Sequence, residues 1–159
     1  MTDTIAFIAL VISVYGLWLS YKIAQIFALR NEDKMLVDEL LAVLRDMQEQ
    51  ASHFFLDNRQ ERPNSHIYVA NISSKISIAS FIIHTLKNDR SILKSNIDLP
   101  FSDLYLYGTL DVEQVNKQKP ENNAEQFANM DQAYLKCVGI IYRSFQAKYQ
   151  RIDKIYNLI

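Results

Sequence analysis

The sequence has few of the residues that make disulfides, tight turns and metal sites. Its 159 residues include one cysteine, three glycines and three prolines. Cys137 alone cannot form an internal disulfide, and a structural zinc site would be expected to use at least two thiolates. No Cys-x2-Cys or His-x3-His spacing occurs, and the glycines are too far apart for a phosphate-binding loop. We therefore expect no metal or cofactor, a reducing compartment, and a few long helices.

Excess charge of either sign is also missing. The chain carries 17 basic and 18 acidic residues, a formal net charge of −1. Nucleic-acid-binding domains usually show a clear basic excess, so the composition does not indicate a nucleic-acid partner, and this question stays open. A hydrophobic content of 49% with 22% charged residues is typical of a folded protein.

Side-chain charge is absent throughout Thr4–Tyr21, a run of 18 residues. As a helix the run is about 27 Å long, close to the roughly 30 Å hydrocarbon core of a bilayer. We predict a transmembrane helix within residues 1–30 and a cytoplasmic helical domain over residues 31–159. The alternatives are a buried core helix and a signal peptide. A signal peptide would begin with positive charge and end in a small-residue cleavage site, and neither is present.

The residues that flank the run predict how it lies in a membrane. Asp3 precedes it, whereas Arg30 and Lys34 follow it. Positive charge favours the cytoplasmic side, so we expect a single pass through the inner (cytoplasmic) membrane with the N-terminus outside. Aromatic and basic side chains at the far end of the run are typical of a lipid–water interface. They are Tyr15, Trp18, Tyr21 and Lys22.

Small residues form one stripe along this helix. They recur at spacings of three and four, which places them on one face at about 100° per residue. In lipid, helices associate through small side chains that let their backbones approach closely. A lone span has no second span in its own chain, so we predict self-association, with a chance arrangement as the alternative. The stripe comprises Ala6, Ala9, Ser13, Gly16, Ser20 and Ala24.

The chain after the span shows helical patterns separated by short polar segments. Residues 34–50 have the apolar spacing of an amphipathic helix. This helix either continues from the span as one rod or is separated from it by a kink near Arg30. Residues 57–65 are polar and include Pro63, which indicates a loop.

Residues 66–87 are predicted to form the next helix, with Asn64 or Ser65 as its N-cap. Their isoleucine and serine content is typical of a strand, but no other segment would pair with a lone strand. Residues 98–101 are expected to form a turn.

The longest amphipathic pattern lies at the end of the chain. Asn123-x-x-Gln126 resembles a capping box, and from Phe127 apolar residues recur every three or four positions to Ile159. The predicted fold class is therefore all-α. It consists of an N-terminal transmembrane helix, a cytoplasmic helical bundle and a long C-terminal amphipathic helix.

One constellation has catalytic potential. Arg59 and His66 are separated by six residues, and Arg62 lies between them. This spacing resembles the Arg-x4-6-His motif of the HEPN superfamily of helical ribonucleases, although Pro63 inside it departs from the pattern. The resemblance implies a histidine that moves a proton and an arginine that steadies phosphate charge, without a metal. The alternative is a solvated loop next to an interfacial histidine.

The layout also resembles a group of small bacterial phage-defence membrane proteins, including the membrane accessory protein of RNA-targeting type VI CRISPR systems. That resemblance implies a ring of protomers whose N-terminal helices form a pore, and a partner protein from a defence system. We therefore expect a self-associating, membrane-perturbing protein with lipid as its surroundings. The alternatives are a membrane-tethered ribonuclease and a non-catalytic scaffold or adaptor.

Overall fold

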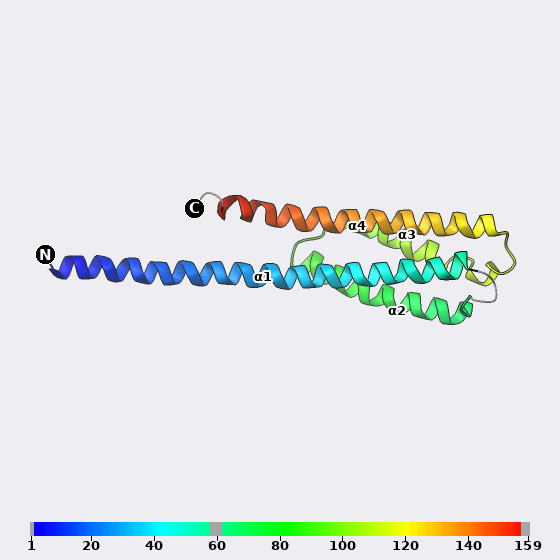
Figure 1. Cartoon of the computed structure of the whole chain (residues 1–159), viewed down its shortest axis with the longest axis horizontal. Coiled ribbons are helices and arrows are strands. Elements are labelled where there is room, and N and C mark those ends of the chain that lie inside the picture. Colours follow the sequence, from blue (N-terminus) through cyan, green and yellow to red (C-terminus); the bar gives the residue numbers. More distant parts are fainter. Residues whose placement is uncertain (1, 58–61, 157–159) are drawn as a thin grey trace. The chain divides into compact units, whose positions relative to one another are not determined.

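The computed structural model describes residues 2–57 and 62–156, and it divides into two compact units, Met1–Met35 and Leu36–Ile159. Within the described residues all regular structure is helical, so the predicted all-α class is confirmed at that level. The described residues include four α-helices (Figure 1). They are α1 (Thr2–Leu56), α2 (Ser65–His84), α3 (Asp98–Thr109) and α4 (Pro120–Tyr156).

The connections between the later helices are short helical turns of other kinds. A π-helical turn over Thr85–Asp89 extends α2, and 3-10 turns over Ser95–Ile97 and Val112–Gln114 lie on either side of α3. From the sequence, the span and the helix that follows it could form either one continuous helix or two helices with a kink near Arg30. A single helix runs over Thr2–Leu56, which accords with the lack of proline and glycine between Gly16 and Pro63.

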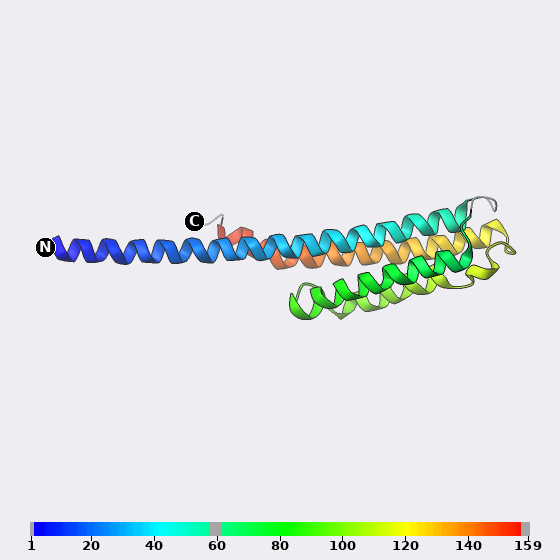
Figure 2. The same ribbon diagram turned by 90° about the horizontal axis from the view of Figure 1, so that it is seen from below.

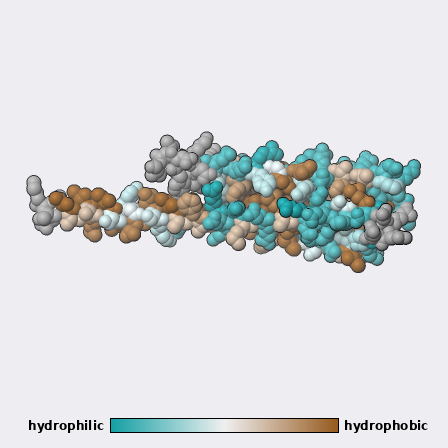
Figure 3. Space-filling model, viewed as in Figure 1, coloured by the Kyte–Doolittle hydropathy of each residue, from teal (hydrophilic) through white to brown (hydrophobic). Residues whose placement is uncertain are grey.

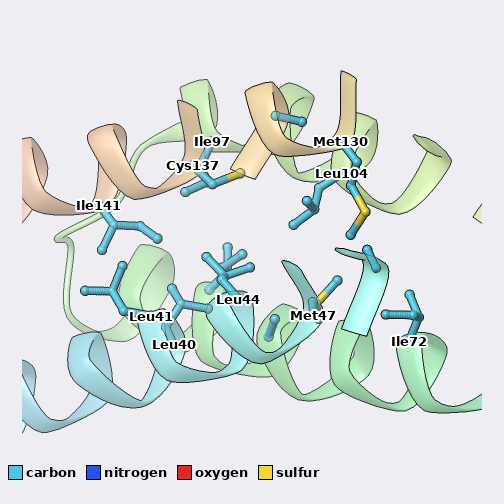
Figure 4. Packing of buried hydrophobic residues seen from close by; sticks show 14 of the residues in the cluster. Leu40, Leu41, Leu44, Met47, Ile72, Ile97, Leu104, Met130, Cys137 and Ile141 are labelled. Carbon is cyan, nitrogen blue, oxygen red and sulfur yellow. The ribbon is translucent and has the colours of Figure 1, made fainter. Parts of the chain in front are cut away.

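The C-terminal unit is held by one hydrophobic core to which all four helices contribute (Figure 4). Buried side chains recur every three or four positions on each long helix, as one apolar face requires. The residues that Figure 4 labels are Leu40, Leu41, Leu44 and Met47 of α1, Ile72 of α2, Ile97 of the 3-10 turn before α3, Leu104 of α3, and Met130, Cys137 and Ile141 of α4.

Polar contacts at the edge of this core also join the helices to one another. Gln48 Nε2 donates to Asp131 Oδ1 at 3.1 Å and joins α1 to α4. Lys75 forms an ion pair with Asp46 and joins α2 to α1. Both views show α4 antiparallel to the part of α1 in this unit (Figures 1 and 2).

One predicted turn and one predicted helix start are wrong, and one predicted cap is confirmed. Asn64 caps α2, because its side chain accepts from the backbone N–H of His66 at 2.8 Å. Residues 98–101 do not form a separate turn. They are the first turn of α3, where Pro100 is tolerated because an N–H there has no helical partner.

The capping box predicted at Asn123 is also absent. The long helix α4 begins at Pro120, and the backbone N–H of Asn123 already donates to the carbonyl of Lys119 at 3.4 Å. The Asn123 side chain is buried and donates to the Val115 carbonyl at 3.1 Å. Gln126 donates to the carbonyls of Tyr107 and Leu110, so it ties α4 to the end of α3.

Candidate functional site

The apolar part of α1 exposes its side chains on every face. Each described residue from Thr4 to Lys22 is exposed, and Ile5, Phe7 and Leu17 are 68%, 67% and 74% accessible. Figure 3 shows mostly hydrophobic surface along this part of the chain. None of the most apolar 18-residue window is buried. The run is thus not buried within the described chain, and its length and composition suit a membrane span.

Two residues of the small stripe have local surroundings that the structure defines. A Cβ added to Gly16 would meet no atom within 4 Å, so the space beside it is open. Ser13 Oγ donates to the Ala9 carbonyl at 2.9 Å, which satisfies the hydroxyl within the helix. Such internal bonding lets a serine sit in an apolar medium at little cost.

The other face of the helix carries the predicted interfacial residues. The rings of Tyr15 and Trp18 stack, with centroids 5.8 Å apart. Gln25 Nε2 donates to the Tyr21 hydroxyl at 2.8 Å. The sequence reasoning missed Gln25, although its position four residues after Tyr21 places the two on one face. Aromatic and polar groups paired in this way are suited to the boundary between lipid and water.

A second helical segment is also a candidate membrane span by its length and composition. Residues 65–89 are long and apolar enough, but 28% of their most apolar window is buried inside the unit. Ile72 and Ala79 are fully buried in the shared core, and the Tyr68 ring is 2% exposed. These contacts fit a core helix of the C-terminal unit.

Arg62, one residue of the predicted ribonuclease motif, bonds to backbone carbonyls at the end of α1. Its Nε donates to the Asp57 carbonyl at 2.7 Å and its Nη2 to the Phe55 carbonyl at 3.0 Å. Its Nη1 lies 3.4 Å from the carbonyl of Val115 and from Asn116 Oδ1. The guanidinium thus caps carbonyls at the C-terminal end of α1. These contacts favour a structural role for Arg62.

Of the other two motif residues, Arg59 and His66, the structure describes only His66. Arg59 lies outside the described residues. His66 is exposed in the first turn of α2, where its ring is accessible to a solute. The predicted pairing of Arg59 with His66 therefore stays a prediction. Elsewhere His53 Nδ1 lies 3.0 Å from Asp57 Oδ2, an ordinary exposed pair.

Neither a metal site nor a reactive thiol is found in the described part of the chain. No group of three or more possible metal ligands occurs among those residues. Cys137 is fully buried, and burial, with a smaller contribution from Asp103, raises the pKa of its thiol to about 12. A thiol held in the protonated form is a poor nucleophile and a poor ligand. Cys137 acts as a small core residue.

No protein-family model, curated protein or solved structure matches the chain.

Proposed function

We propose that the chain is a single-span membrane protein that assembles with copies of itself and permeabilises the membrane in bacterial antiviral defence. The observation that carries this proposal is the uncharged run Thr4–Tyr21, whose side chains are exposed on all sides. In water, such a surface would be strongly unfavourable, at roughly 25 cal/mol for each Å² of apolar area. In a bilayer the same surface is solvated by lipid.

Self-association follows from the faces of this helix. Its bulky and aromatic side chains lie on one side, and the stripe containing Ser13, Gly16 and Ser20 lies on the other. Close backbone approach along the stripe would gain dispersion contacts that lipid chains cannot supply. In the assembly Ser13 and Ser20 face a neighbour or the central axis. Their hydroxyls are the polar groups that a conducting path through the run would use.

The proposal includes the orientation of the chain in the membrane and the signal that activates it. The N-terminus lies outside and the C-terminal unit forms a helical bundle in the cytoplasm of the inner membrane, as the basic residues after the run favour. A cytoplasmic bundle can receive a signal from another protein of a defence system. The bundle then has a regulatory rather than a catalytic role.

The size of the assembly in mild detergent tests self-association. Sedimentation of the wild-type chain should give an oligomer, and Gly16→Leu should give a monomer, because the new side chain fills the open space that a neighbouring helix would approach. Val11→Leu adds bulk on the opposite face and should leave the oligomer intact. A wild-type monomer, or equal loss in both variants, contradicts the proposal.

Dye release tests permeabilisation. Liposomes that contain the wild-type chain should release an entrapped dye, and liposomes with the Gly16→Leu chain should retain it. A wild-type oligomer that releases no dye would support the scaffold alternative instead. Release that is equal for both chains would show that the stripe plays no part in it.

The exposed ring of His66 gives the ribonuclease alternative its one supporting observation. With Arg62 held by backbone carbonyls, such an enzyme would use Arg59 and His66 alone.

A further inference from the structure

A basic cleft lies in the C-terminal unit between the connection after α2 and one face of α4. Its volume is about 420 Å³. Among the described residues that line it, none is acidic. The polar and basic members are Ser91, Lys94, Asn96, Arg143, Ser144 and Lys148.

The connection that forms one wall of the cleft is held firmly against the core. The backbone N–H of Arg90 donates to the Thr85 carbonyl at 3.0 Å, and that of Ile92 donates to the Leu86 carbonyl at 2.8 Å. Ile92 is 4% exposed and anchors the segment. Lys148 Nζ donates to the Arg90 carbonyl at 2.8 Å and ties α4 to this connection. These contacts attach the wall to the core and to α4.

The opposite wall is a single face of α4. Ser144 and Lys148 lie four residues apart and project to the same side of the helix, and Arg143 lines the cleft from the position before Ser144. Arg143 Nε donates to the Gly139 carbonyl at 3.0 Å, which orients the guanidinium along the helix. Arginine has further donors on its two terminal nitrogens. Across the cleft, Lys94 is exposed and brings a third positive charge, from the connection.

We propose that this cleft binds a phosphate group. Phosphate oxygens accept charge-assisted hydrogen bonds from guanidinium and ammonium groups, and serine hydroxyls and an asparagine amide add neutral donors. The volume lies within the roughly 300–1,000 Å³ of small-ligand sites. The phosphate belongs either to an anionic lipid headgroup or to a small soluble phosphate. The assignment stands on the cleft itself and does not depend on self-association.

Titration calorimetry on the full chain, in a non-ionic maltoside detergent without phosphate, tests this site. The two probes are inorganic phosphate and dihexanoyl-phosphatidylglycerol. At least one should bind, and binding should weaken as salt rises above 0.1 M because the contacts are electrostatic. Tighter binding of the lipid identifies a headgroup site, and tighter binding of inorganic phosphate identifies a solute site.

The double variant Lys94→Gln/Arg143→Gln should bind the better probe at least tenfold more weakly, since it loses two charged donors. Lys94→Arg/Arg143→Lys keeps both charges and should retain most of the binding. Lys117→Gln/Lys136→Gln removes two exposed charges elsewhere and should bind like the wild type. The proposal is overturned if neither probe binds the wild type, if the first variant binds normally, or if the control loses as much.

Discussion

Arg62 reaches back over the end of α1 and donates from Nη2 to the carbonyl of Phe55, 3.0 Å away. The same guanidinium bonds the Asp57 carbonyl and contacts the Val115 carbonyl. Asn123 also donates to that Val115 carbonyl. One arginine therefore joins the end of the first helix to the segment that leads into α4.

Replacing Arg62 should destabilise the C-terminal unit. Arg62→Ala leaves carbonyls at the end of α1 without their donor, which we expect to lower the free energy of unfolding by about 1–3 kcal/mol. Urea denaturation of the full chain in detergent, followed by circular dichroism, measures this change. Arg45→Ala, at an exposed position of α1, is the control and should stay within about 0.5 kcal/mol of the wild type. Equal stability of the two variants would show that the Arg62 contacts contribute little.

The hydroxyl of Tyr68 is buried in an unfavourable position. The ring is 2% exposed and stacks on Phe54 with centroids 3.9 Å apart, and its hydroxyl has no hydrogen-bond partner among the described residues. Desolvation raises the pKa of Tyr68 far above its usual value. Tyr68→Phe should therefore be neutral or stabilising by up to about 1 kcal/mol. Tyr68→Ala should cost about 3–5 kcal/mol, because it leaves a cavity.

The same urea titration measures both Tyr68 variants. Loss of more than about 1 kcal/mol in Tyr68→Phe would reveal a strong hydrogen bond to the hydroxyl, contrary to the buried, unpartnered position.

Cys137 should be unreactive while the chain is folded. Its pKa is raised to about 12, whereas an unfolded cysteine titrates near about 8.5. At pH 8 to 9 the folded chain thus keeps the proton, and the unfolded chain exposes a thiolate. A thiol-specific reagent at pH 8 should label Cys137 slowly in detergent and rapidly in concentrated denaturant. Rapid labelling of the folded chain would contradict its burial.

RNA cleavage distinguishes the membrane proposal from the ribonuclease alternative. We expect the purified chain to leave single-stranded RNA intact in the presence of a metal chelator, at the same background rate as His66→Ala. Arg59→Ala should behave in the same way. Metal-independent cleavage that is lost in both variants would establish the ribonuclease instead.

Local patterns in the sequence were sufficient for the long helices. The spacing of Leu40, Leu44 and Met47 predicts one buried face, and Asn64 before an apolar run predicts an N-cap, because both signals lie within a few residues. The uncharged run at Thr4–Tyr21 likewise depends only on composition. These features could be derived without knowledge of any tertiary contact.

Other features depend on contacts between distant segments and could not be predicted. Asn123 looks like a helix cap, but its amide is drawn to the Val115 carbonyl in the interior. The anchoring of Arg62 requires the end of α1 and residue 115 to be neighbours in space. The basic cleft also combines Lys94 and Arg143, which lie far apart in the sequence. Local spacing contains no signal for any of these three.

Extraction from membranes is the most direct test of whether Thr4–Tyr21 is embedded in lipid. Membranes from cells that express the chain are washed with alkaline carbonate, which releases proteins held only by surface contacts. The chain should stay in the pellet and enter solution only with detergent, and Leu10→Arg/Ile12→Arg should shift it to the wash, because charges at mid-membrane cost about 2.5–3.5 kcal/mol each. Release of the wild-type chain as a soluble monomer by carbonate alone would contradict the membrane assignment.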